Sequence, residues 1–294
     1  MRAEGIGELQ TKLFEIDGRR LYYHDEGAGR SVLILHGASL TQGAGAWDQV
    51  ARALVEAGYR AIFPYRAGRG ESDPHPIFLS LARDSRDMWA LTDELALDRV
   101  VLVGHSAGAF VARDMLLKQP HRVAGVVSED SAAFGKLSSA THKAADTDRF
   151  DAEDRALYEK YKETLAFLER PWEYPSEHNV LRILKRRKAL HRDNLWKRQQ
   201  VPHPDDAPVP EGRWCKVPLL LFTAGRGRIR QDDPEADQLR QQIPAEDVQF
   251  IVVTKSGHGI HEEQFEIFMR ELLAFLERSQ RPRRGQGHTS DVQF

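Results

Sequence analysis

The sequence of 294 residues has a single cysteine, Cys215, and no long apolar run. One cysteine excludes an intrachain disulfide, which is typical of proteins in a reducing compartment. No apolar run approaches the roughly 20 residues of a transmembrane helix, and residues 1–14 lack the apolar core of a signal peptide. We therefore expect a cytoplasmic protein in which Cys215 is a packing residue rather than a nucleophile.

The sequence also lacks an excess of either charge, a repeat of fixed period and a ligand cluster with metal spacing. Its 42 basic and 44 acidic residues leave a formal net charge of -2, which gives no general reason to expect nucleic acid or a membrane surface as partner. The missing repeat disfavours solenoids and propellers. We expect a small-molecule ligand and neither a metal nor an organic cofactor, while the sequence indicates no oligomeric state.

Short apolar segments alternate with helical patterns along most of the chain. This alternation predicts an α/β fold, a doubly wound and mostly parallel sheet with crossover helices. The predicted strands are Ser31 to Gly37, Arg60 to Tyr65, Arg99 to Ser106, Arg122 to Asp130, Val217 to Gly225 and Val248 to Gly259.

The alternation is interrupted once. Two charged helical patterns, residues 151–170 and 178–200, occur there among six prolines, which indicates a helical cap inserted into one domain. The polar C-terminal tail is rich in breakers and is expected to be disordered. The expected organisation is a core of residues 1–130 and 217–278, a cap of residues 131–216 and a tail of residues 279–294.

Ser106 lies in "GHSAG", directly after a predicted strand and before a helical pattern. Gly-x-Ser-x-Gly in this setting is typical of a nucleophilic serine on a tight strand-to-helix turn, where small neighbours tolerate the crowding. Acyl transfer also needs two donors for an oxyanion, and the backbone amides of Ala107 and Ala38 are the candidates. Ala38 follows the predicted strand that ends in "LILHG".

The candidate base is His258, in the glycine-flanked loop "SGHGIHEE" between the last strand and the last helix. Such a loop can present an imidazole above the carboxyl edge of the sheet. His261 is the rival, but it lies nearer the helix start and is expected to cap or pack. His36 is expected to shape its loop, and His105 is expected to face away from Ser106.

The motifs "HGAS", "PYRAGRGESD", "GHSAG" and "GHGIHEEQ" together resemble the α/β-hydrolase fold superfamily, over about Leu13 to Arg278 outside the inserted block. The resemblance implies the chain order Ser, acid, His and a cap over the site. Relatives that dehalogenate or open epoxides use an aspartate at the position of Ser106. The serine therefore favours hydrolysis of an ester, lactone, thioester or amide through an acyl-enzyme.

The triad acid is missing from its usual place. In the superfamily it commonly follows the strand equivalent to "VPLLLFTAG" in a Gly-x-x-Asp pattern, and Arg228 stands there. Some members place it after the strand before the cap, where Glu129 and Asp130 stand. Neighbouring side chains point oppositely, so at most one of the two would face His258. The resemblance favours Asp130, with Asp232 or Asp233, Glu129 or no acid at all as alternatives.

These residues predict a serine hydrolase of a small or medium carboxylic ester or lactone, with Ser106, His258 and Asp130 as the triad. Two other classes fit the same residues. One is a ligand-binding, receptor-like protein on a hydrolase scaffold with weak turnover. The other is an acyltransferase or cofactor-free lyase that uses the same site.

Overall fold

The computed structural model describes residues 9–37, 47–75, 80–135, 150–167, 180, 206–226 and 229–279. Ala38, Arg228, most of the expected helix at 178–200 and the tail beyond Ser279 lie outside the described residues. The division into a core and a cap stays a prediction.

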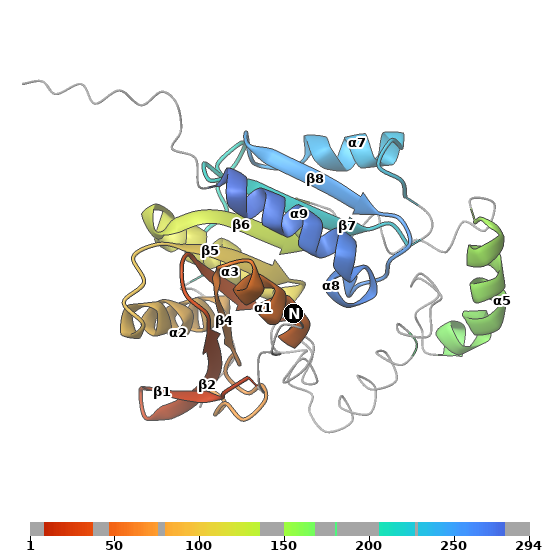
Figure 1. The fold of residues 1–294 in the computed structure, drawn as a ribbon. Helices are drawn as coiled ribbons and strands as arrows, with labels where there is room; N and C mark the ends of the chain where they lie inside the picture. The colour runs from red at the N-terminus through yellow and green to blue at the C-terminus, as the bar shows by residue number, and fades with distance from the viewer. Residues whose placement is uncertain are drawn as a thin grey trace, which may run out of the picture.

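An eight-stranded sheet forms the centre of the molecule (Figure 1), in the order β1-β2-β4-β3-β5-β6-β7-β8. The strands from β4 to β8 are parallel, whereas β1 and β2 are antiparallel to their neighbours. The predicted α/β fold with a mostly parallel sheet is confirmed. The strands are β1 (Lys12–Ile16), β2 (Arg19–Glu26), β3 (Ser31–Leu35), β4 (Arg60–Pro64), β5 (Val100–His105), β6 (Val123–Glu129), β7 (Leu219–Ala224) and β8 (Val248–Val253).

The antiparallel pair β1 and β2 was not predicted, although the sequence carries its signal. Burial alternates along β1, and Ile16 pairs with Arg19 across the two-residue turn Asp17-Gly18. Both turn residues have positive φ, 49° and 71°, as Asp-Gly turns in hairpins require. A period of two around an Asp-Gly pair is a hairpin signal.

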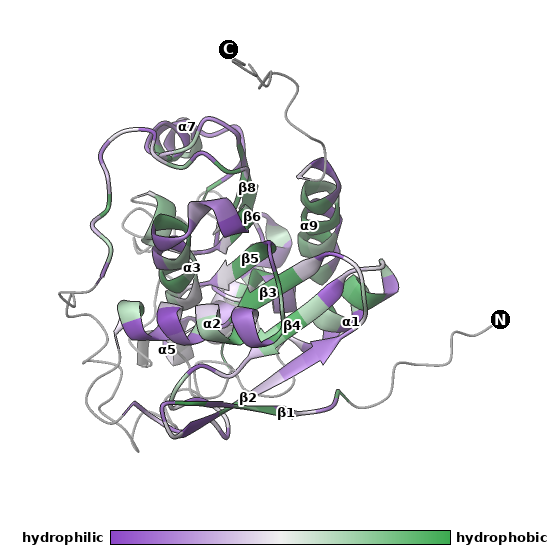
Figure 2. Ribbon diagram, turned by 90° about the vertical axis from the view of Figure 1, so that its left-hand side faces the viewer, coloured by the Kyte–Doolittle hydropathy of each residue, from purple (hydrophilic) through white to green (hydrophobic). Residues whose placement is uncertain are grey.

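Helices cover both faces of the sheet (Figure 2), and each face has its own apolar core. On one face, α2 and α3 pack beside α7 through residues such as Leu91, Met115 and Leu239. On the other, α1 and α9 pack through Leu54 and Leu272. The helices are α1 (Asp48–Glu56), α2 (Leu81–Glu94), α3 (Ala107–Lys118), α5 (Ala152–Phe167), α7 (Pro234–Gln241), α8 (Ile260–Glu263) and α9 (Phe265–Arg278), with 3-10 turns at Pro120–Arg122 and Ala132–Phe134.

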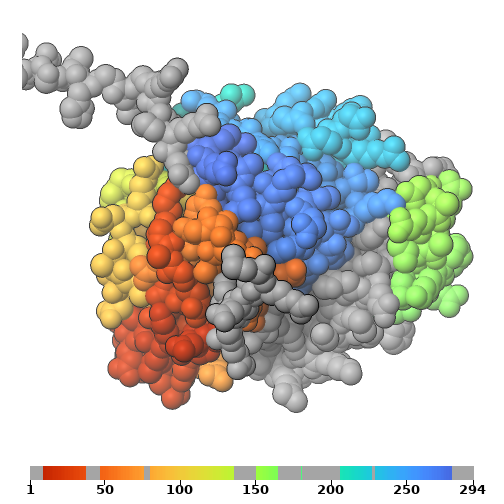
Figure 3. Space-filling view, viewed as in Figure 1, coloured from red at the N-terminus to blue at the C-terminus, as the bar shows by residue number. Residues whose placement is uncertain are grey.

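Helix α5, the longest described element of the expected cap, projects beside the C-terminal part of the core (Figure 3). Lys255, in the loop after β8, joins it to the core. Its Nζ lies 2.8 Å from a carboxylate oxygen of Asp151 and 2.8 Å from one of Glu153. The start of α5 is thereby tied to the loop that also carries His258.

Helix α3 approaches the sheet more closely than a side chain would allow. A Cβ added to Gly108 would lie 1.9 Å from the carbonyl oxygen of Leu35 in β3, and one added to Gly104 would lie 2.5 Å from Cα of Ala109. Both contacts are with backbone, which cannot rotate away. The two glycines around Ser106 therefore allow α3 to begin directly above β3 and β5.

Gly108→Ala is expected to lower the free energy of unfolding by about 3 kcal/mol or more, because the added methyl group overpacks a backbone contact. The control is Gly18→Ala, where a Cβ meets nothing within 4 Å and only the positive φ is strained, at about 1 kcal/mol. Urea unfolding of both variants measures the difference. Equal losses would contradict the packing argument.

Candidate active site

Ser106 occupies a strained turn between β5 and α3. Its backbone has φ 52° and ψ -117°, a conformation that is costly for a non-glycine residue and that clusters at active sites. The turn is held from β6: the amide of Ser106 donates to the carbonyl of Glu129 (3.0 Å), and the hydroxyl of Ser131 donates to the carbonyl of Ser106 (2.9 Å). This is the tight turn that "GHSAG" predicts.

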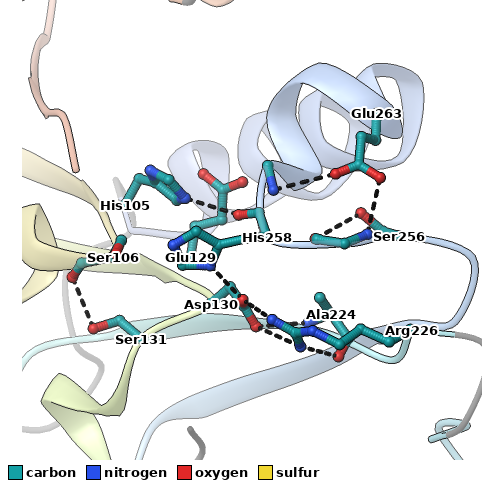
Figure 4. Close-up of polar contacts among 12 residues, drawn as sticks. His105, Ser106, Glu129, Asp130, Ser131, Ala224, Arg226, Ser256, His258 and Glu263 are labelled. Carbon is teal, nitrogen blue, oxygen red and sulfur yellow. Dashed lines mark hydrogen bonds and ion pairs between the residues drawn. The ribbon is translucent and has the colours of Figure 1, made fainter. Parts of the chain in front are cut away.

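His258 and Asp130 meet at the carboxyl edge of the sheet (Figure 4). The imidazole Nδ1 lies 2.6 Å from Oδ2 of Asp130. The His258 side chain is 21% exposed and that of Asp130 is 6% exposed. The remaining ring nitrogen, Nε2, is thus available for proton transfer, although within the described residues no hydrogen bond joins it to Ser106.

The loop of His258 is fixed from both sides. The carboxylate of Glu263 in α8 accepts hydrogen bonds from the amides of Gly257 (2.9 Å) and Gly259 (3.3 Å). The carbonyl of His258 accepts one from Nε2 of His105 (2.8 Å). Burial lowers the pKa of His105 to about 3, so this ring is neutral over the working pH range of most enzymes.

Three residues donate hydrogen bonds to the buried carboxylate of Asp130. Its Oδ1 accepts from the amide of Ala224 (3.0 Å), and its Oδ2 lies 2.6 Å from Nη2 of Arg226 as well as close to His258. Burial alone would raise the pKa of this carboxyl. The positive charge of Arg226 and the hydrogen bond from His258 outweigh it and hold the pKa well below its usual value, so Asp130 is ionised.

Glu129, one of the alternative acids, faces the other way. Its carboxylate accepts from the backbone amide of His261 (2.9 Å) and from Nδ1 of the same residue (2.8 Å). Both side chains are fully buried, and the His261 ring stacks on Trp47 with centroids 3.8 Å apart. Burial raises the pKa of Glu129, but the favourable interaction with His261 outweighs it and the pKa is lowered.

Asp232, the other named alternative, is exposed before α7. Asp233, the N-cap of α7, accepts from the amide of Arg230 (3.0 Å). Among the described residues, Asp130 is the acid that bonds to His258.

The loop after β3, which leads to the candidate oxyanion donor Ala38, begins at a fixed point. Nε2 of His36 accepts from the amide of Arg66 (3.1 Å), and its Nδ1 donates to the carbonyl of Gly37 (2.8 Å). The Arg66 guanidinium donates to the carbonyls of both His36 and Gly37 and is paired with buried Asp84. His36 therefore shapes its loop, and burial together with Arg66 keeps the pKa of His36 well below its usual value.

Of the two candidate oxyanion donors, Ala107 is at the first position of α3, where backbone amides have no partner within the helix and favour an anion. Ala38 follows Gly37 outside the described residues.

Two arginines at this edge were not singled out from the sequence. Arg66 follows β4, and Arg226 follows β7 by two positions. Both are buried. A charged side chain is seldom buried unless it is paired, and these two are paired with Asp84 and Asp130. Arginine at the carboxyl end of a buried strand is the signal that could have found them.

Among the described residues, no group of three or more His, Cys, Asp or Glu side chains could hold a metal ion. No helix in the described part of the chain is long and apolar enough to cross a membrane. Cys215 is buried and makes no disulfide.

Comparison with known families agrees with the fold. The model of the alpha/beta hydrolase family matches residues 32–271. The chain belongs to this family and is an α/β hydrolase.

Similar proteins differ in what they act on. A 2-hydroxy-6-oxo-6-phenylhexa-2,4-dienoate hydrolase from Burkholderia cepacia is 33% identical over 114 residues, 37% of this chain and 38% of that protein. An N-acyl homoserine lactone degrading enzyme has a similar structure, with a TM-score of 0.66 and 22% identity over 90% of this chain and 100% of the other. A meta-cleavage product hydrolase from Pseudomonas fluorescens IP01 gives a TM-score of 0.64 at 20% identity, covering 91% and 98%. The chain spans about two fifths of the length of the first curated relatives that it matches.

Glu129→Gln is expected to lower the free energy of unfolding by about 3 kcal/mol, because it weakens a buried, charge-assisted pair. The pKa of Glu129 is lowered in the folded protein, so its contribution is full above the ordinary pKa of 4.5 and is lost as the pH falls below it. Urea unfolding at pH 7 and at pH 4 measures both effects.

The matched control is Glu266→Gln, which changes an exposed glutamate on α9 and is expected to alter stability by less than about 0.5 kcal/mol. A Glu129→Gln protein as stable as this control at pH 7 would contradict the assignment of the buried pair.

Proposed function

We propose that this α/β hydrolase cleaves a carboxylic ester or lactone of small to medium size through an acyl-enzyme on Ser106. The hydrogen bond between Asp130 and His258, 2.6 Å long, is the observation that carries the proposal. It fixes the tautomer of the imidazole with the proton on Nδ1, so that Nε2 can accept a proton. Ser106 on its strained turn supplies the nucleophile.

In the proposed reaction, Ser106 Oγ attacks the carbonyl carbon while Nε2 of His258 takes the hydroxyl proton. The amides of Ala107 and Ala38 hold the oxyanion. Collapse of the tetrahedral intermediate breaks the carbon–oxygen bond, and His258 returns the proton to the leaving alkoxide. Water then attacks the acyl-enzyme with His258 again as base, which releases the acid and restores Ser106.

The choice among family reactions depends on the nucleophile. A serine forms an acyl-enzyme with carbonyl substrates, whereas relatives that open epoxides resemble this architecture with an aspartate at this position. The structural similarity to a lactone degrading enzyme supports lactones as a substrate class. The similarity to a dienoate hydrolase and to a meta-cleavage product hydrolase supports a second candidate, hydrolysis of a carbon–carbon bond next to a ketone by the same three residues.

A fluorophosphonate probe is expected to label the protein stoichiometrically, and Ser106→Ala is expected to abolish the labelling. Ser279→Ala is the matched control, because the Ser279 hydroxyl, at the end of α9, donates to the backbone carbonyl of Leu276 (2.9 Å) and its removal should leave Ser106 reactive. Intact-mass spectrometry gives the readout. An unlabelled wild-type protein would favour the ligand-binding alternative instead.

Asp130→Asn is expected to lower kcat on p-nitrophenyl butyrate by about 10³–10⁴-fold, because an amide cannot hold the imidazole in its working tautomer or stabilise the imidazolium. Asp232→Asn removes the exposed rival acid and should keep wild-type turnover. The same steady-state assay measures both variants. The assignment of Asp130 is wrong if its variant keeps full activity or if Asp232→Asn is the one that fails.

The substrate panel for the wild-type protein separates the remaining alternatives. It contains γ-butyrolactone, an N-acyl homoserine lactone and a 2-hydroxy-6-oxohexa-2,4-dienoate beside simple esters. Turnover of the dienoate alone would favour the carbon–carbon hydrolase. Formation of a new ester when an alcohol is added would indicate acyl transfer.

A further inference from the structure

Arg226 and His258 share one carboxylate oxygen. Nη2 of Arg226 and Nδ1 of His258 each lie 2.6 Å from Oδ2 of Asp130. The Arg226 side chain is 5% exposed, so solvent screens the interaction little. In Figure 4 the guanidinium and the imidazole approach the carboxylate from different segments, the loop after β7 and the loop after β8.

Arg226 is itself held in place by the end of β7 and by the loop after β8. Its backbone is left-handed (φ 53°), a conformation that is costly for a non-glycine residue. Its amide donates to the carbonyl of Ser256 (3.1 Å), two positions before His258, and its Nη1 donates to the carbonyl of Ala224 (2.9 Å). The guanidinium therefore has one position relative to both Asp130 and the loop of the base.

Within the described residues, the other ionisable groups around His258 already have partners or are neutral. His105, whose ring centroid lies 4.6 Å from that of His258, is neutral above pH 3 or so because burial lowers its pKa to about 3. Glu129 is paired with His261, and Glu263 accepts from the loop amides. Lys255 is paired with acids of α5. Asp130 and Arg226 are thus the pair of opposite charges that His258 faces.

We propose that Arg226 is a positioning residue that aims the Asp130 carboxylate at His258 and, by neutralising its charge, keeps His258 a weaker base than an unpaired aspartate would make it. The inference rests on the proposed role of His258 as the general base. Under this proposal Arg226 has two separable effects: it orients the carboxylate of Asp130, and it neutralises the charge of that carboxylate.

The sign of the charge effect follows from electrostatics. An aspartate favours the imidazolium form and raises the pKa of a neighbouring histidine, whereas a cation disfavours this form. Removing the charge of Arg226 therefore leaves the aspartate uncompensated and raises the pKa of His258. The base then loses its unprotonated form at a higher pH, and activity declines earlier as the solution is acidified.

The first test measures the pKa of His258 directly by NMR in the full chain. The Cε1 proton of His258, assigned by its absence in His258→Asn, is titrated in a Ser106→Ala background. Arg226→Met is expected to raise this pKa by about 1 unit or more. Arg226→Lys keeps the charge and should titrate like the wild-type protein. Arg230→Met removes an exposed arginine of the same loop, and in this variant His258 should also titrate as in the wild-type protein.

The second test is the pH profile of kcat/KM on p-nitrophenyl butyrate, whose acid limb reports the base of the free enzyme. The limb of Arg226→Met should move to higher pH by the same amount as the NMR titration, while that of Arg226→Lys should not move. A lower kcat with an unmoved limb in folded Arg226→Met would overturn the charge effect. Equal shifts in the Met and Lys variants would overturn it as well.

Circular dichroism and thermal unfolding show whether each variant is folded. If Arg226→Met does not fold, Arg226→Gln, which keeps amide donors without the charge, carries the same test with the same expected shift. The NMR titration needs no turnover. A shift of His258 in a protein that hydrolyses no substrate therefore upholds the role of Arg226 and counts against the proposed function alone.

Discussion

The negative charge of a buried carboxylate has to be balanced by nearby charges and hydrogen bonds. In this protein, groups from three segments balance the charge of Asp130. Taking an ionised group out of water costs several kcal/mol unless charges and hydrogen bonds replace the solvent. The amide of Ala224, the guanidinium of Arg226 and the imidazole of His258 replace it here. Because these donors come from the end of β7, the loop after it and the loop after β8, the charge fixes the relative positions of the segments that form the site.

The strand order explains why an arginine is present. In the sheet, β7 lies between β6 and β8, so an acid at the end of β6 meets a base from the loop after β8 across the end of β7. In this chain the carboxylate that follows β6 is that of Asp130. The guanidinium of Arg226, two positions after β7, lies 2.6 Å from it and neutralises its charge.

Much of this could be predicted from the sequence, because parallel strands bring their carboxyl ends to one edge. The apolar strands, the turn at Ser106 and the acid at the end of β6 are all local patterns, and alternation of side chains along a strand separates Glu129 from Asp130. Arg226 was not predicted because its role depends on a contact 96 positions away in the chain. In that loop the resemblance places an acid at the position of Arg228, and it assigns no role to Arg226.

Glu129 and Asp130 show how one strand end can serve both stability and chemistry. Each binds a histidine, but the pair of Glu129 and His261 is fully buried whereas His258 is partly exposed. The buried pair fixes the start of α8, and Glu263 at the end of that short helix binds the amides on both sides of His258. The partly exposed imidazole of His258 needs such support, since a glycine-flanked loop has little conformational preference of its own. The core pair therefore supports the loop of His258 through α8.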